Sequence, residues 1–358
     1  MPHTQATTLD LSASAIELTR ALCDIESVSG NEKTIADAVE ASLQDAAHLE
    51  LFRDGDAIVA RTNLGRARRV VIAGHIDTVP INDNLPTKIV GDELWGRGTV
   101  DMKAGVAVQL KLAAELAEPS VDITWIWYDH EEVSEELNGL GRLARARPDL
   151  LEGDFAILGE PTAAIIEGGC NGNLRVEVRA FGKRAHAARA WAGHNAIHDL
   201  APILGALAEY TPREVEVEGL VYRESLNAVG ISGGVAGNVI PDEGMVHINY
   251  RFAPSRTGAE AVEHLRELFA GFELTVVDVA EGARPGLDAA LAKEFVAAVG
   301  GTPLPKYGWT DVARFAALGI PAVNYGPGDP VFAHADDERV PLAQITACEQ
   351  ALRTWLNG

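Results

Sequence analysis

Thiol groups are scarce in this sequence and widely spaced. The 358 residues include three cysteines, Cys23, Cys170 and Cys348, which form no Cys-x-x-Cys motif. A disulfide framework or a thiolate zinc site is therefore not expected. Long apolar runs are also missing, since no stretch of 18 apolar residues occurs and the first ten residues have neither a basic nor an apolar leader region. We expect a cytoplasmic protein that has no membrane partner.

Positive charge is the other deficit. The chain carries 30 lysines and arginines against 52 aspartates and glutamates, and its formal net charge is -22 at pH 7. Such a field repels phosphate backbones and anionic lipid surfaces, so nucleic acid and anionic membranes are excluded as expected partners. A hydrophobic fraction of 47% in a chain of this length instead indicates a large core and two domains.

Buried strands alternate with helices over the first part of the sequence. Apolar runs at 70–73, 122–128 and 155–158 predict strands, and the Ala/Leu-rich segment 103–116 predicts a long helix. Further expected elements are helices over 12–22 and 33–47, a hairpin around 54–56 and a single short strand over 88–95. This alternation predicts an α/β fold with a mixed or parallel sheet.

The pattern changes near Asn173, where strands begin to alternate apolar and charged residues. Strands are expected at 174–181, 225–231, 245–252 and 273–279, with helices at 196–210 and 259–269. This order predicts a small α+β sandwich inserted into the larger domain. The α/β pattern then returns with a helix over 288–299, a strand over 322–325 and a helix over 341–356. We predict a discontinuous catalytic domain over 1–172 and 285–358, and an inserted domain over 173–284.

A His-x-Asp motif follows the strand predicted at 70–73. His75 and Asp77 lie in the segment Gly-His-Ile-Asp-Thr-Val-Pro at 74–80. If the strand continues through Ile76, both side chains point to the same side of the sheet. That arrangement suits one metal ligand and one carboxylate that orients it. Such a pair alone is more often a turn or surface feature.

Five more residues of ligand type follow, four of them just after predicted strands and one in a Gly/Pro-rich loop. They are Asp101, Glu131, Glu132, Glu160 and His334. Taken singly, each has an ordinary interpretation as a helix N-cap, a solvated acidic pair, a turn acid or a surface histidine. Together they supply nitrogen and oxygen ligands at the strand ends where open α/β sheets place their sites. We therefore expect a catalytic zinc pair, with cobalt or manganese as alternatives.

The ordered motifs resemble the M20 family of co-catalytic zinc peptidases and deacylases. They are GHIDTVP, GRGTVDMK at 96–103, the adjacent Glu131 and Glu132, GEPT at 159–162 and the late His334. The resemblance spans essentially the whole chain, because it includes AGNVIPD at 236–242, NYRFAP at 249–254, YGWTDVARF at 307–315 and NYGPGD at 324–329.

The resemblance implies two Zn²⁺ ions per subunit, bridged by Asp101. It places His75 and Glu160 in one metal site and Glu132 and His334 in the other. It further implies that Asp77 holds the ring of His75 and that Glu131 is the general base.

For the inserted domain, the resemblance implies a homodimer in which His186, within KRAHA at 183–187, stabilises the oxyanion in the partner's site. His194 and His198 are an alternative pair, spaced four apart in a predicted helix, and we interpret them as structural.

The expected substrate is a small acylated amino acid with several carboxylates. Arg251 can bind a carboxylate through two parallel hydrogen bonds, although a salt bridge on the strand face is its ordinary alternative. Asn238 and Thr310 are candidate neutral donors. At Gly169-Cys170-Asn171 some relatives carry an arginine, so the contacts on that side stay open.

The reaction implied by the resemblance is metal-assisted hydrolysis of an amide bond. Other deacylases and peptidases of the same family are the enzymatic alternatives. A catalytically silent binding protein is an alternative of another class. The presence of the complete set of seven ligand, base and orienting residues argues against it.

Overall fold

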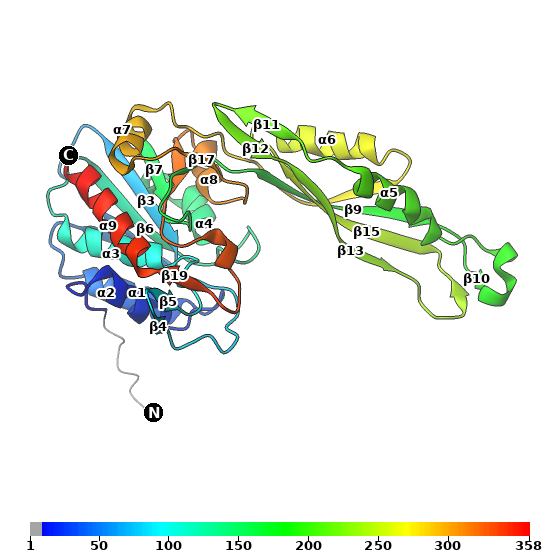
Figure 1. Cartoon of the computed structure of the whole chain (residues 1–358), viewed down its shortest axis with the longest axis horizontal. Coiled ribbons are helices and arrows are strands. Elements are labelled where there is room, and N and C mark those ends of the chain that lie inside the picture. The colour runs from blue at the N-terminus through cyan, green and yellow to red at the C-terminus, as the bar shows by residue number, and fades with distance from the viewer. Residues whose placement is uncertain (1–8) are drawn as a thin grey trace. The chain divides into compact units, whose positions relative to one another are not determined.

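The computed structural model describes residues 9–358 and divides into two compact units (Figure 1). Unit 1 comprises the chain up to Gly168, Gly286–Leu304 and Arg314–Gly358, and unit 2 comprises Gly169–Pro285 and Pro305–Ala313. The segment Pro305–Ala313 therefore packs with unit 2, whereas the sequence prediction assigns it to the catalytic domain. Residues 1–8, where that predicted domain begins and no leader pattern is seen, lie outside the described residues.

A mixed sheet of eight strands forms the centre of unit 1. Its strand order is β1-β2-β6-β3-β7-β18-β8-β17. The central strands β3, β6, β7 and β18 run parallel, and β2 pairs antiparallel with both β1 and β6. The strands are β1 (Glu50–Asp54), β2 (Ala57–Arg61), β3 (Arg69–His75), β6 (Asp122–Tyr128), β7 (Phe155–Leu158), β8 (Glu167–Gly168), β17 (Leu304–Pro305) and β18 (Ala322–Asn324). The carboxyl ends of β3, β6 and β7 consequently meet at one edge of the sheet.

Helices flank this sheet, as the predicted fold class requires. The helix α3 (Lys103–Glu115) contacts β3 on one side and the helices α1 (Ala15–Cys23) and α9 (Leu342–Asn357) on the other. Because it is covered on both sides, α3 is buried along most of its length despite the polar Lys103 and Gln109. Unit 1 also contains α2 (Lys33–Leu43), α4 (Gly139–Ala146), α7 (Ala290–Val299) and most of α8 (Val312–Ala317), with single turns at Pro148–Leu150 and Pro330–Phe332.

A separate three-stranded sheet joins two loops of unit 1 that are far apart in sequence. It has the order β19-β5-β4, with β4 (Lys88–Val90), β5 (Glu93–Trp95) and β19 (Arg339–Pro341). The single strand expected over 88–95 was wrong, because the chain turns at Gly91, which has a φ of 64° that favours glycine. Pairing of Arg339 with Trp95 places the residues before β19 beside those after β5.

Unit 2 contains an antiparallel sheet of four strands with helices packed against it (Figure 1). The order is β13-β15-β9-β16, formed by β9 (Gly172–Phe181), β13 (Ser225–Gly233), β15 (Glu243–Phe252) and β16 (Glu273–Ala280). Alternate residues of β9 and β15 are buried, and they form a core with α5 (Ala201–Glu209) and α6 (Gly258–Leu268). The predicted α+β sandwich is therefore present.

Two small antiparallel strand pairs in unit 2 were missed by the sequence prediction. They are β10 (Ala185–His186) with β14 (Val239–Ile240), and β11 (Glu214–Val217) with β12 (Leu220–Arg223). The helix expected from residue 196 begins with a 3₁₀ turn at His198–Leu200, and another 3₁₀ segment covers Ala187–Ala192. Among residues 9–358, no helix combines the length and apolar character that a membrane span needs.

Candidate metal centre

The candidate site lies at the sheet edge where three parallel strands of unit 1 end. His75 is the last residue of β3, Glu131 and Glu132 follow β6, and Glu160 follows β7. The strand ends at His75, so the condition that it continues through Ile76 is not met. Strand alternation therefore does not explain how His75 and Asp77 meet. Instead, the turn after the strand brings Asp77 back to the ring of His75.

The first group of candidate ligands contains His75, Asp101 and Glu160. One donor atom from each lies within 4.8 Å of the others. Nε2 of His75 is 3.0 Å from Oδ1 of Asp101. His75 and Glu160 are buried, so these donors face each other in a largely dry environment.

The second group contains Asp101, Glu132 and His334, again with donor atoms within 4.8 Å. Nε2 of His334 is 3.4 Å from Oδ2 of Asp101 and 3.0 Å from Oε2 of Glu132. The two carboxylate oxygens of Asp101 thus face different histidines, which is the arrangement that a bridging ligand needs. The backbone of His334 has a φ of 65°, a conformation that costs about 1–3 kcal/mol for a residue with a side chain.

Charge complementarity within these groups shifts their pKa values. Hydrogen bonds to Asp101 and Glu132 raise the pKa of His334 to about 10. Burial opposes protonation of His75, but its hydrogen bonds to Asp101 and Asp77 outweigh that effect and raise its pKa well above 6.5. Burial would raise the pKa of Asp101, yet the two histidines hold it below its usual range. These carboxylates therefore attract positive charge strongly.

The donor set fits a pair of divalent cations. Three carboxylates and two imidazoles supply only oxygen and nitrogen ligands, which suit zinc, cobalt or manganese. Each group provides three protein ligands, and three is the number that catalytic zinc sites use when a position is kept for water or substrate. The residues present therefore fit the metal pair that the sequence predicts.

Asp77 connects the first group to the candidate base. Its Oδ1 accepts from the backbone N–H of Glu131 and its Oδ2 from that of Glu132, each at 3.1 Å. Nδ1 of His75 lies 3.0 Å from the backbone oxygen of Asp77 and 3.4 Å from its Oδ1, so the backbone oxygen is the nearer acceptor. Ser29 Oγ also donates to Oδ2 at 2.6 Å. Asp77 thus holds the ring of His75 through its backbone oxygen, and its carboxylate holds the turn that carries both glutamates.

Glu131 lies beside the metal ligands and is only partly buried. Donor atoms of His75, Glu131 and Glu132 lie within 4.8 Å of one another. The two groups that share Asp101 contain Glu160 and Glu132 but not Glu131. Glu131 is therefore a carboxylate at this edge that neither group needs as a ligand. Its position suits proton transfer near the metal pair.

The other four predicted site residues lie in unit 2. His186 is exposed, and its Nδ1 accepts the backbone N–H of Ala188 at 3.0 Å. A neutral His186 therefore carries its proton on Nε2 and presents it as a donor. The backbone oxygen of Asn238 accepts from Ala187 at 2.9 Å, so Asn238 and His186 are brought together.

Arg251 and Thr310 occupy another part of unit 2. Arg251 lines a hollow within this unit, together with Asn171, Arg223 and Tyr307. Burial lowers the pKa of its guanidinium, and no carboxylate of residues 9–358 forms an ion pair with it. Thr310 is buried, and its backbone oxygen lies 3.7 Å from the Cys170 sulfur. The same hollow is also lined by Glu214 and Glu224, so it carries charges of both signs.

His194 and His198 do not form a pair on one helix. His194 lies before the 3₁₀ turn and pairs its Nε2 with Asp199, while His198 faces the Asn195 side chain. Neither histidine belongs to a candidate metal group among the described residues. Their interpretation as structural residues stays a prediction.

Sequence reasoning missed three residues that hold the site in place. Ser29 supports Asp77, and the buried pair Arg97 and Glu338 contacts the backbone beside two candidate ligands. A usable signal existed for two of them, because Arg97 stands between two glycines in GRGTVDMK and Glu338 follows His334 by four residues.

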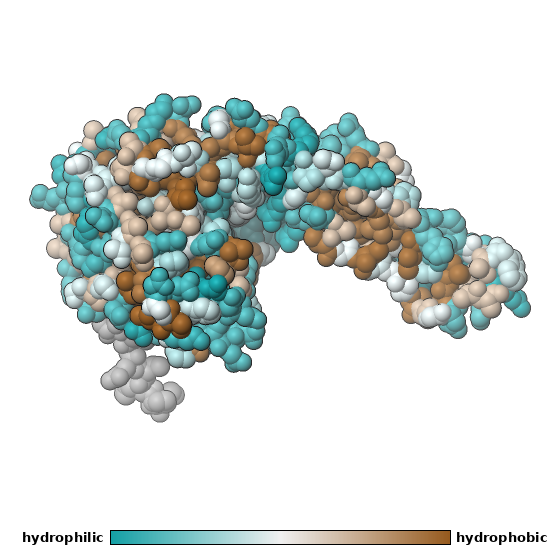
Figure 2. All heavy atoms as spheres, in the orientation of Figure 1, coloured by the Kyte–Doolittle hydropathy of each residue, from teal (hydrophilic) through white to brown (hydrophobic). Residues whose placement is uncertain are grey.

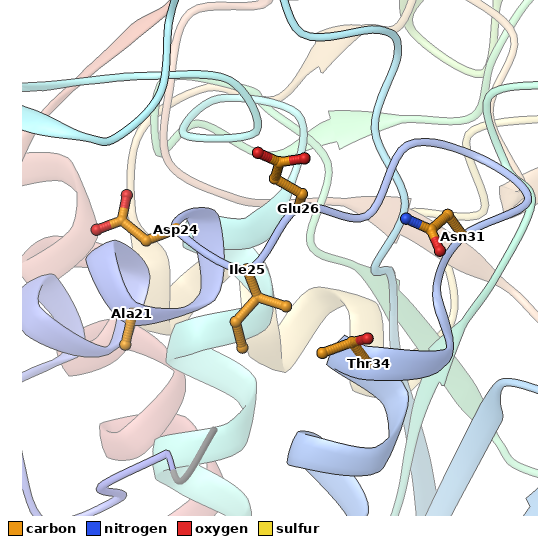
Figure 3. Close-up of a pocket in the computed structure, with 6 residues that line it drawn as sticks. All are labelled: Ala21, Asp24, Ile25, Glu26, Asn31 and Thr34. Atoms are coloured by element: carbon orange, nitrogen blue, oxygen red, sulfur yellow. The ribbon is translucent and has the colours of Figure 1, made fainter. Parts of the chain in front are cut away.

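A surface hollow of unit 1 lies on the connection between α1 and α2 (Figure 3). It is lined by Ala21, Asp24, Ile25, Glu26, Asn31 and Thr34. Another part of the same connection contacts the metal centre, since Ser29 Oγ donates to Oδ2 of Asp77 at 2.6 Å. No predicted site residue lines the hollow, so it is separate from the metal centre.

Sequence comparison gives matches over nearly the full chain. Residues 71–357 match the family model described as Peptidase family M20/M25/M40. The chain is 55% identical over 353 residues to the "Putative succinyl-diaminopimelate desuccinylase DapE" of Mycobacterium tuberculosis, covering 98% of this chain and all of that protein. It is 49% identical over 360 residues to the succinyl-diaminopimelate desuccinylase of Corynebacterium glutamicum, covering 98% of each.

Solved structures show the same fold at lower sequence identity. A tripeptidase from Staphylococcus aureus matches with a TM-score of 0.77 at 21% identity, over 98% of both chains. A Bacillus subtilis protein described as a dinuclear metal binding peptidase matches with a TM-score of 0.72 at 18% identity, over 96% of both chains.

Proposed function

This chain belongs to peptidase family M20/M25/M40, and we propose that it hydrolyses N-succinyl-LL-2,6-diaminopimelate to LL-2,6-diaminopimelate and succinate. The full-length identity to two proteins that carry the desuccinylase name supports this substrate. The observation that carries the hydrolase reaction is the placement of Asp101, whose two oxygens face His75 and His334. The product places the enzyme in diaminopimelate and lysine biosynthesis. A cytoplasmic location is part of the proposal and suits three buried cysteines without a disulfide.

The proposed cofactor is a pair of Zn²⁺ ions, with Co²⁺ or Mn²⁺ as substitutes. His75 and Glu160 would hold one ion, and Glu132 and His334 would hold the other. Asp101 would be a ligand of both ions. When bound, such a pair lowers the pKa of a water molecule and polarises the scissile carbonyl. Asp77 would fix the tautomer of His75 so that Nε2 faces the ion.

Glu131 is the proposed general base and acid. It would take the proton of the attacking water and return it to the leaving amine, which keeps the proton balance within one side chain. Its backbone N–H is held by Asp77, so the carboxylate starts from a fixed turn beside the ligands. That preorganisation limits the motion needed for both proton transfers.

We propose that unit 2 forms a homodimer through its exposed apolar face. β13 is an edge strand, and Val229 and Ile231 on it are 63% and 57% exposed. Leu204 on α5 is also exposed, and hydrophobic side chains gather on the visible face of this unit in Figure 2. An unpaired apolar edge of this kind is an association surface. A second copy of the chain is the proposed occupant.

His186 is the proposed oxyanion donor in the partner's site. Its Nε2–H is available because Nδ1 is occupied by the N–H of Ala188. Replacing His186 by alanine is expected to lower kcat by about 10²–10³-fold, with metal content unchanged, because one preorganised donor is lost. Steady-state kinetics and metal analysis of the variant measure both quantities.

Mixing two inactive variants tests whether His186 acts across the dimer. In a mixture of H186A and E131Q subunits, a mixed dimer retains one site with an intact Glu131 and an intact His186 from the partner. Random exchange into closed two-fold dimers is then expected to restore about a quarter of wild-type activity. Absence of any recovery after demonstrated exchange would contradict the assignment in trans.

Substrate carboxylates are the proposed ligands of Arg251, Asn238 and Thr310. The net charge of -22 gives no long-range attraction for an anionic substrate, so recognition has to rely on local donors. Arg251, partly buried and without an ion-pair partner among the described residues, suits bidentate binding of a carboxylate.

The alternative is another deacylase of the family, such as an acetylornithine deacetylase. Turnover of N-succinyl-LL-diaminopimelate and of N-acetylornithine by the same zinc-loaded sample separates the two. We expect kcat/KM to favour the succinyl substrate by at least about 100-fold. Hydrogen-bond donors that are placed to bind the succinyl carboxylate stay unpaired when the acyl group has no carboxylate. Preference for the acetyl substrate would overturn the substrate assignment and leave the hydrolase assignment intact.

A further inference from the structure

A buried ion pair outside the ligand set links the loops of the metal centre. Arg97 Nη1 donates to Glu338 Oε2 at 2.7 Å, and the two side chains are only 4% and 1% exposed. Burying an ion pair is unfavourable unless its remaining polar atoms are also satisfied. Both side chains meet that condition through backbone groups of neighbouring loops.

Glu338 binds the loop that carries Asp101. Its Oε1 accepts from the backbone N–H of Val100 at 2.9 Å and from that of Asp101 at 3.2 Å. Its own backbone oxygen accepts from Gly96 at 3.0 Å. A residue 238 positions away from Val100 in sequence thus fixes the backbone of the shared metal ligand.

Arg97 binds the loop that carries His334. Its guanidinium donates to the backbone oxygen of Ala335 at 3.2 Å and to that of His334 at 3.5 Å. Its Nε donates to the backbone oxygen of Pro80, in the segment that follows Asp77, at 3.2 Å. One planar side chain therefore joins its own loop to two others, and the fixed donor geometry of arginine suits such contacts.

His334 needs such support more than the other ligands do. Its side chain is 54% exposed, and its backbone lies in the left-handed region at a φ of 65°. His75, by contrast, is buried at the end of a central strand. Packing therefore positions His75, whereas the position of His334 depends on hydrogen bonds to its backbone.

From these contacts we infer that Arg97 and Glu338 are positioning residues, which act together as a clamp that sets the geometry of the second metal site, Asp101–Glu132–His334. The inference rests on the proposed two-metal centre and adds residues that are not themselves ligands. Loss of the clamp lets the His334 loop move, so the second site weakens more than the first site, His75–Asp101–Glu160.

The test is the replacement of Arg97 by lysine, which keeps the charge but cannot reach the three backbone oxygens at once. Zinc binding to chelator-stripped protein is followed by titration calorimetry. We expect one of the two zinc ions to bind about 10–100-fold more weakly, the effect typical of outer partners of metal ligands, while the other keeps its affinity. The variant H334A lacks a ligand of the second site. Its titration therefore shows which of the two zinc-binding events belongs to that site.

Arg53→Lys is the matched control. Arg53 also binds several groups at once, with ion pairs to Asp37, Glu40 and Asp56 at 2.7–2.9 Å. It lies on β1, so we expect both zinc affinities of this variant to equal those of the wild type.

Titration of zinc into the stripped wild-type protein tests the proposed metal centre separately, because that centre requires two zinc ions to bind. If the wild type binds two zinc ions and R97K binds both with unchanged affinity, the clamp is overturned and the metal centre is not. Equal weakening of both sites in R97K would also overturn the clamp. If R97K does not fold by circular dichroism, the variant E338Q decides the question with the same titration. It keeps the backbone acceptor at Oε1 but removes the charge that holds Arg97. Selective weakening of the second site supports the clamp, and wild-type affinities overturn it.

Discussion

Replacing Glu131 by glutamine is expected to lower kcat by about 10²–10⁴-fold while the protein still binds two metal ions. Glutamine has nearly the same shape as glutamate but cannot accept the proton of the attacking water at neutral pH. Glu131 is absent from the two ligand groups that share Asp101, so its replacement leaves both of them complete. The backbone hydrogen bond from residue 131 to Asp77 is also preserved.

The measurement combines steady-state kinetics with metal analysis of the same sample. The matched control is Glu136→Gln, five residues further along the same loop, where the side chain is exposed. We expect wild-type kinetics from that control. Retained turnover in E131Q would refute the base assignment, and loss of metal in E131Q would assign Glu131 to the ligand set instead.

Replacing Asp101 by asparagine is expected to weaken both metal sites together, each by more than about 100-fold, and so to abolish turnover. One oxygen of Asp101 is 3.0 Å from His75 and the other is 3.4 Å from His334. An amide keeps the shape but loses the negative charge and one acceptor oxygen. The backbone N–H to Glu338 is unaffected, so the loop itself stays in place.

The contrast with His334→Ala makes this prediction specific. That variant removes a ligand of the second group alone, so one metal ion is expected to bind normally. Titration of zinc into the stripped variants shows the number of sites that remain. If D101N loses only one ion, Asp101 is a ligand of one site and the shared-ligand description is wrong.

The sheet and the position of the site could be predicted from the sequence for a simple physical reason. Buried parallel strands have continuous apolar runs, and their carboxyl ends lie at one edge, so polar residues after each run converge. This logic places His75, Glu132 and Glu160 without any knowledge of long-range contacts. The structure does bring these residues into the two groups that share Asp101.

Other parts of the site are set by contacts that no local pattern encodes. His334 lies in an irregular loop, so the strand-end pattern does not predict where its side chain lies, although its residue type made it a candidate ligand. Arg97 and Glu338 meet because β5 and β19 pair, and that pairing joins segments from distant parts of the chain. The local periodicity of a sequence does not show which distant strand a segment pairs with.

Small elements also escaped prediction where turn chemistry decided the outcome. The segment 88–95 reads as one apolar strand, but Gly91 and Asp92 allow a tight turn that splits it into β4 and β5. In unit 2, the two-residue strands β10 and β14 are too short to produce a periodic signal. They nevertheless hold His186 beside Asn238, which is the feature that matters for the proposed oxyanion donor.

The most direct test of the whole account is succinate release from N-succinyl-LL-diaminopimelate by zinc-loaded protein. The same sample is assayed after removal of zinc by a chelator and again after zinc is restored. The account predicts turnover that disappears with the metal and returns with it, because the ligand groups around Asp101 hold the ions that the reaction needs. Succinate release that persists in metal-free protein, or its absence in protein that holds two zinc ions, would contradict the account.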